Sequence, residues 1–230
     1  MAPLDDLLDD IFDGKRPPLY PEFEGWVRGS RRFKAFAVRY RGKIRAKLKN
    51  ARDEGGLSDV RAELETAARL LRDDRFTLEY EKYAASRQRG PDFTVTFKTH
   101  TPFNVEVRRV RSLELNAEDA EARTAKLMAV LCDKVGQMPP GIVNLLWLIA
   151  EDDVSDTDLT RAATTLRQLA ERKTEDFFMR RGFESAAHFL KQYRLLSGIV
   201  LRQSGEHVFW LNSLARHKAP PEIVNAIQRL

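Results

Sequence analysis

The apolar positions between residues 31 and 52 recur at intervals of three and four along the chain. This period predicts an amphipathic helix, with Gly42 as a weak point in its interior. Glu54-Gly55-Gly56 is expected to end it. The first 25 residues contain four prolines and predict a short helix followed by an extended arm. The apolar stripe of the long helix consists of Phe33, Phe36, Ala37, Tyr40, Ile44 and Leu48.

Between residues 57 and 150 the pattern of apolar residues changes from a helical period to the alternation that is typical of strands. A second helix is predicted from Ser58, a suitable N-cap. Strict alternation of apolar and polar residues then predicts three strands, and Asn116 is expected to cap a helix that ends near Val135. The apolar run 142–149 fits a strand that is buried on both faces. The predicted order is therefore helix, three strands, helix, strand, with the first three strands at 76–80, 93–97 and from 103 onward.

The remaining residues predict helices at 157–172 and 185–195, then a hairpin from 199–201 to 208–211. Pro220-Pro221 is expected to open a last short helix. The fold class expected from these patterns is α/β, with a mixed central sheet flanked by helices and with additional N-terminal and C-terminal helices. The organisation is an acidic arm and basic helix at 1–56, a core at 57–150, and a C-terminal helical extension at 151–230 that completes the same domain.

Composition narrows the class of protein. Apolar residues make up 43% and charged residues 32% of the 230 residues, which is typical of a folded globular chain. A single cysteine, Cys132, rules out an internal disulfide and a thiolate zinc site. The longest apolar run is too short to cross a bilayer, and acids near the N-terminus stand where a signal peptide has basic residues. We therefore expect a cytoplasmic protein with no membrane partner.

Charge is strongly segregated at the N-terminal end. Residues 1–24 contain seven acids and two bases, whereas residues 25–52 contain eleven bases and no acid. This indicates either a surface that follows the phosphates of a nucleic acid or an acidic arm that folds back on the basic helix. Binding to a membrane surface is a rival interpretation. The candidate nucleic-acid-binding residues are Arg31, Arg32, Lys34, Arg39, Arg41, Lys43, Arg45, Lys47 and Lys49, together with Lys98.

The candidate active site lies on two predicted strands. Asp92 stands at the start of one strand, while Glu106 and Arg108 share a face of the next, about 6–7 Å apart. If the strands pair, the two acids can share a divalent cation through oxygen ligands. Glu63 flanks the apolar stripe of the second helix and could complete the metal shell, whereas Glu65 is a poorer candidate because it lies opposite that stripe.

Pro91-Asp92, a gap of thirteen residues and then Glu106-Val107-Arg108 resemble the PD-(D/E)XK nuclease superfamily, which has the restriction-endonuclease-like fold. The predicted order of elements over 57–150 matches the core of that superfamily. The resemblance implies that Asp92, Glu106 and Glu63 bind magnesium or manganese. It also implies that Arg108 takes the place of the motif lysine.

Arginine keeps the charge of that lysine but cannot act as a base. Lys98 or Lys126 could substitute for it. The resemblance thus implies a nucleic-acid-binding hydrolase, acting on DNA rather than RNA, and leaves a homodimer open. Two alternatives remain: a catalytically inactive binding or interaction module on the same fold, and an ordinary solvated strand face with Asp92 as a turn residue.

Overall fold

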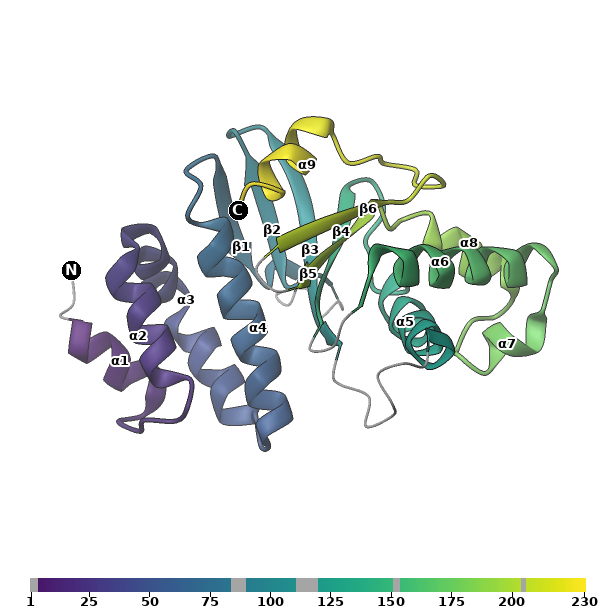
Figure 1. Ribbon diagram of the computed structural model, residues 1–230. Helices are drawn as coiled ribbons and strands as arrows, with labels where there is room; N and C mark the ends of the chain where they lie inside the picture. The colour runs from purple at the N-terminus through teal and green to yellow at the C-terminus, as the bar shows by residue number, and fades with distance from the viewer. Residues whose placement is uncertain (1–3, 84–89, 111–119, 151–153, 204–205) are drawn as a thin grey trace.

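The computed structural model describes residues 4–83, 90–110, 120–150, 154–203 and 206–230. Within these residues the chain forms one mixed six-stranded sheet with helices on both of its faces (Figure 1). This confirms the expected α/β class. The strands lie in the order of the sequence: β1 Phe76–Tyr80, β2 Phe93–Phe97, β3 Thr101–Val110, β4 Val143–Ala150, β5 Gly198–Gln203 and β6 Glu206–Leu211.

The first three strands form an antiparallel meander, because β1 pairs with β2 and β2 pairs with β3 in opposite directions. β4 runs parallel to both β3 and β5, and β6 closes the series antiparallel to β5. The expected hairpin near the C-terminus is thus confirmed as β5 and β6. Residues 151–230 therefore contribute two strands to the common sheet in addition to their helices.

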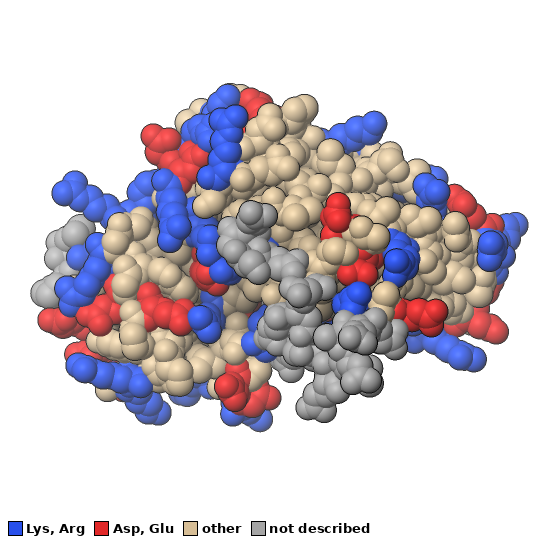
Figure 2. Space-filling model, viewed as in Figure 1, with Lys and Arg blue, Asp and Glu red and all other residues tan. Residues whose placement is uncertain are grey.

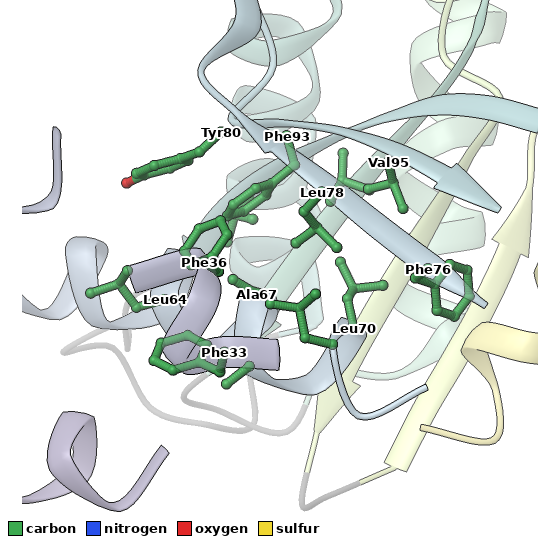
Figure 3. Close-up of a cluster of buried hydrophobic side chains, with 14 of the residues drawn as sticks. Phe33, Phe36, Leu64, Ala67, Leu70, Phe76, Leu78, Tyr80, Phe93 and Val95 are labelled. Atoms are coloured by element: carbon green, nitrogen blue, oxygen red, sulfur yellow. The ribbon is translucent and has the colours of Figure 1, made fainter. Parts of the chain in front are cut away.

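One face of the sheet carries the N-terminal helices α1 Leu4–Phe12, α2 Tyr20–Gly29, α3 Arg31–Asn50 and α4 Glu54–Leu70 (Figure 1). The core beneath them is rich in aromatic residues. Figure 3 shows Phe36 of α3 near Tyr80 and Phe93 of the sheet, and Phe33 stacks on Phe36 from within α3. The extended arm expected after the first helix is wrong, because α2 occupies that segment. Pro21 is compatible with α2 since it lies in the first turn, where a backbone N–H has no partner inside the helix.

The start of α4 also differs from the prediction. Its N-cap is Asp53 instead of Ser58, and the Asp53 side chain accepts a hydrogen bond of 2.6 Å from the backbone N–H of Gly56. The two glycines therefore lie in the first turn of α4 and do not end α3. The break in α3 falls at Tyr40 (φ −110°, ψ 16°), two residues before the glycine that marked the expected weak point.

The opposite face carries α5 Ala120–Val135, α6 Asp156–Glu171, α7 Glu175–Met179 and α8 Ala186–Tyr193. Leu146 and Leu148 of β4 pack against these helices, while Trp147 packs on the other side of the sheet. This confirms a strand buried on both faces. The short helix α7 was not predicted, and the expected cap at Asn116 lies outside the described residues.

The chain ends with α9 Pro221–Ile227, whose Ile223 and Ile227 join the core on the face of the N-terminal helices. The expected opening of this helix at Pro220-Pro221 is confirmed. None of the helices that the structure describes is long and apolar enough to cross a membrane.

Candidate active site

Asp92 and Glu106 meet on neighbouring strands. β2 and β3 are antiparallel with Phe93 opposite Val105, so the register places Asp92 opposite Glu106. The carboxylate of Asp92 fixes this arrangement, because its Oδ2 accepts a hydrogen bond of 2.8 Å from the backbone N–H of Val107. The two acids expected to share a site are therefore held side by side where β2 begins.

Burial and mutual repulsion perturb both acids. Burial raises the pKa of Glu106 to about 7, and the charge of Asp92 adds to this effect. Burial likewise raises the pKa of Asp92, although the charge of Lys47 opposes the shift. Each raised pKa means that the negative charge is not fully compensated in the folded protein. The solvated strand face considered above does not describe β3, since Glu106 is only 5% exposed.

Glu63 reaches the same region from α4. Its Oε2 lies 2.6 Å from the hydroxyl of Tyr80, which donates a hydrogen bond, and 2.5 Å from Nζ of Lys47. Burial, followed by the charge of Asp92, raises the pKa of Glu63 to about 7. The charge of Asp92 thus acts on both Glu63 and Glu106.

Lys47 lies among these acids, although its sequence pattern assigned it to a nucleic-acid-binding surface. Its Nζ is 2.5 Å from Glu63, 3.0 Å from Glu81 and 3.6 Å from Asp92. It also lies 5.0 Å from the centre of the Tyr80 ring. Position 47 follows the apolar Tyr40 by seven residues, so it falls on the buried face of α3. A lysine on the buried face of a helix was therefore the sequence signal that could have placed Lys47 at the site instead of on the exposed basic surface.

Lys134 of α5 is the basic residue that the structure pairs with Glu106, at 2.6 Å between Nζ and Oε1. The pair is nearly closed to solvent, with side-chain exposures of 12% and 6%. Lys98, one of the two expected substitutes, instead follows the far end of β2 and pairs with Glu222 at 3.1 Å. Sequence analysis missed Lys134, although it lies seven residues after Leu127 and therefore on the buried stripe of α5.

The other expected substitute, Lys126, lies eight residues before Lys134 on α5, about 12 Å along the helix axis. Of Lys98, Lys126 and Lys134, the one that pairs with Glu106 within the described residues is Lys134.

Arg108 shares the face of β3 with Glu106 but has a different environment. Its Nε is buried and has no hydrogen-bond partner in the described part of the chain. A buried N–H group without a partner costs free energy, and an anion that accepts a hydrogen bond from it would remove that cost. Arg108 is thus suited to hold a phosphate group next to the acids.

The site as a whole contains more acidic than basic groups. The carboxylates of Glu63, Glu81, Asp92 and Glu106 are balanced by only two ammonium groups, those of Lys47 and Lys134. No group of three or more His, Cys, Asp or Glu side chains among the described residues is arranged to hold a metal ion. The oxygen donors of Asp92 and Glu106 nevertheless fit a hard divalent cation, and their raised pKa values show that additional positive charge would stabilise them.

The basic residues of α3 differ in their partners. Figure 2 shows Lys and Arg side chains on the side of the N-terminal helices, with acidic side chains among them. Arg41 and Arg45 pair with Asp10 at 3.5 and 3.1 Å, and Arg45 also contacts Asp13 at 2.5 Å. For these two arginines the acidic segment does fold back on the basic helix. Six cations of α3 form no ion pair within the described residues. Arg32 and Lys43 bind backbone carbonyls, and the other four are Arg31, Lys34, Arg39 and Lys49.

Arg32 and Lys43 have structural roles. The Lys43 ammonium donates to the carbonyls of Tyr80 and Glu81 at 2.8 and 3.0 Å. The Arg32 guanidinium donates to the carbonyls of Leu71 at 3.0 Å and Asp73 at 2.5 Å, and to that of Phe76. These bonds tie α3 to the end of α4 and to β1, so neither side chain is free to follow a nucleic acid.

Replacing Arg32 with methionine is expected to lower the free energy of unfolding by about 2 kcal/mol, because backbone carbonyls lose a charged donor. Urea unfolding followed by circular dichroism measures the change. Arg31→Met is the matched control, since Arg31 is the exposed neighbour on the same helix. Equal stability of the two variants would contradict the clamping role of Arg32.

Comparison of the chain with protein-family models, with curated proteins and with solved structures gives no match in any of the three.

Proposed function

We propose that the protein is a metal-dependent nuclease of the PD-(D/E)XK type that binds DNA and hydrolyses its phosphodiester bonds. The observation that carries this proposal is the pairing of Asp92 with Glu106 across β2 and β3, with Lys134 at 2.6 Å from Glu106. The order of elements supports it as well, because α4, β1, β2, β3, α5 and β4 follow the pattern helix, three strands, helix, strand. A restriction-endonuclease-like core over these elements is part of the proposal.

Each residue has a role in this proposal. Asp92 and Glu106 are the ligands for magnesium or manganese, and Glu63, which shares the ammonium group of Lys47 with Asp92, is the candidate third ligand. A divalent ion bound there supplies Lewis-acid polarisation of the phosphate and a bound water of lowered pKa. Lys134 takes the place of the motif lysine, beside the water that attacks. Arg108 stabilises the negative charge that grows on the phosphate.

The unpaired cations of α3 provide the electrostatic attraction to the nucleic acid. Phosphate contacts of this kind position a duplex without reading its sequence. Their contribution decreases with salt, because each neutralised phosphate releases counterions. A steep loss of DNA affinity between low and physiological salt is therefore expected of this surface.

One observation favours the second candidate, a catalytically inactive binding module on the same architecture. Lys47 already provides positive charge to Glu63 and Asp92 without any metal. A chain that had lost catalysis would retain such a pair because it stabilises the buried acids. Cleavage and metal binding distinguish the two candidates.

The test is incubation of the purified protein with plasmid and single-stranded DNA in the presence of Mg²⁺ or Mn²⁺. We expect metal-dependent cleavage that falls at least about a hundredfold in Asp92→Asn, since the change removes a negatively charged ligand of the metal that polarises the phosphate. Asp6→Asn, which alters an exposed acid on α1, is the matched control.

Retained DNA binding without cleavage under any of these conditions would favour the inactive module. Absence of DNA binding at low salt would refute both candidates.

A further inference from the structure

Lys47 is a cation held beside two of the acids, Glu63 and Asp92, that the proposed function assigns to the metal. Its ammonium group lies within 3.6 Å of Glu63, Glu81 and Asp92, which come from α4, the end of β1 and the start of β2. Its side chain is only 22% exposed. Burial opposes the charged form, but the attraction of Glu63 and Asp92 outweighs it and raises the pKa of Lys47. Lys47 is therefore a permanent positive charge within the site.

A second cation at the same carboxylates would be repelled by this ammonium group. The repulsion between two charges a few ångströms apart is large in a poorly solvated site. Lys47 and a divalent ion also compete for the same lone pairs of Asp92, because Oδ2 is already occupied by the Val107 N–H and Oδ1 faces Lys47. Asp92 therefore cannot bind the Lys47 ammonium group and a divalent ion equally well at the same time.

The lysine side chain can move without disturbing α3. The helix is anchored by Phe33, Phe36 and Ile44, each at most 5% exposed. Lysine has a flexible four-carbon stem, so its ammonium can withdraw while the backbone stays in place. Only this side chain has to change between a site that holds the ammonium and a site that holds a metal.

We propose that Lys47 is an internal counter-ion that competes with the divalent metal and so sets the metal affinity of the site. The inference depends on the proposed function, because it concerns the same carboxylates. Without metal, Lys47 stabilises the buried acids. When metal binds, Lys47 gives up its contacts with Glu63 and Asp92.

The test measures Mn²⁺ binding by isothermal titration calorimetry and thermal unfolding without metal, for the wild type and for Lys47→Met. We expect at least tenfold tighter Mn²⁺ binding and a lower melting temperature without metal, because the acids lose their partner. Lys49→Met is the matched control, as Lys49 is an exposed lysine on the same helix. If Lys47→Met does not fold, Lys47→Gln removes the charge but keeps a polar group.

Unchanged or weaker Mn²⁺ binding by the Lys47 variant would overturn the inference. If the wild type binds Mn²⁺ and cleaves DNA in an Asp92-dependent manner, such a result leaves the proposed nuclease intact. Mn²⁺ binding by the variant alone would support the inference and show that the wild type is an inactive module. Absence of Mn²⁺ binding in both proteins would overturn the inference together with the proposed metal site.

Discussion

Replacing Lys134 with methionine is expected to reduce DNA cleavage by about 10²–10³-fold, the range found when one preorganised charge is removed from an active site. Lys134 contacts Glu106 at 2.6 Å and is largely shielded from water. No other lysine is paired with Glu106 among the described residues, and Arg108 cannot exchange a proton. Initial rates on supercoiled plasmid, measured at saturating Mg²⁺ or Mn²⁺, give the change.

The control for this variant is Lys126→Met, which alters the lysine that the sequence also offered. It is expected to retain most of the cleavage activity, because Lys134 is the residue paired with Glu106. Equal losses in the two variants would contradict the assignment of Lys134.

Loss of Lys134 also leaves a buried acid without its partner, which destabilises the fold. Lys134→Arg keeps a positive charge beside Glu106 but cannot exchange a proton, so it should retain stability while losing cleavage. This variant separates the catalytic role of Lys134 from its structural role.

Replacing Phe93 with alanine is expected to lower the free energy of unfolding by about 3–5 kcal/mol, as for other fully buried aromatic residues. Phe93 is inaccessible to solvent and stacks on Tyr80 with ring centres 5.1 Å apart. It also contacts Phe36 of α3 and directly follows Asp92 (Figure 3). The cavity would therefore loosen both the core under α3 and the backbone that positions Asp92.

Urea unfolding measures this loss, with Phe177→Ala as control. Phe177 is only partly buried in α7 on the other side of the sheet. Its replacement should therefore lower the free energy of unfolding by clearly less than that of Phe93. A loss below about 1 kcal/mol for Phe93→Ala would mean that the core refills the cavity and that Phe93 is not a main support of the site.

The sequence by itself determined most of the architecture. Alternation and helical periods located the six strands and most helices, because these periods follow directly from backbone geometry. They also indicated that Asp92 and Glu106 would come close if the two strands paired, and the structure shows that β2 and β3 do pair. The sequence predicted Ser58 as the N-cap of the second helix. The start of α4 is set instead by Asp53, whose side chain accepts the capping hydrogen bond.

Only the tertiary structure decided the partners of the charged side chains. A helical period shows that Lys47 and Lys134 lie on buried faces, but it does not show which acids they meet. Lys47 is 16 residues from Glu63 and Lys134 is 28 residues from Glu106, and these pairs form only when α3, α4 and α5 pack on the sheet. Arg32 likewise finds its carbonyl partners about 40 residues away. The electrostatics of a site depend on distances between segments, and local sequence patterns do not contain those distances.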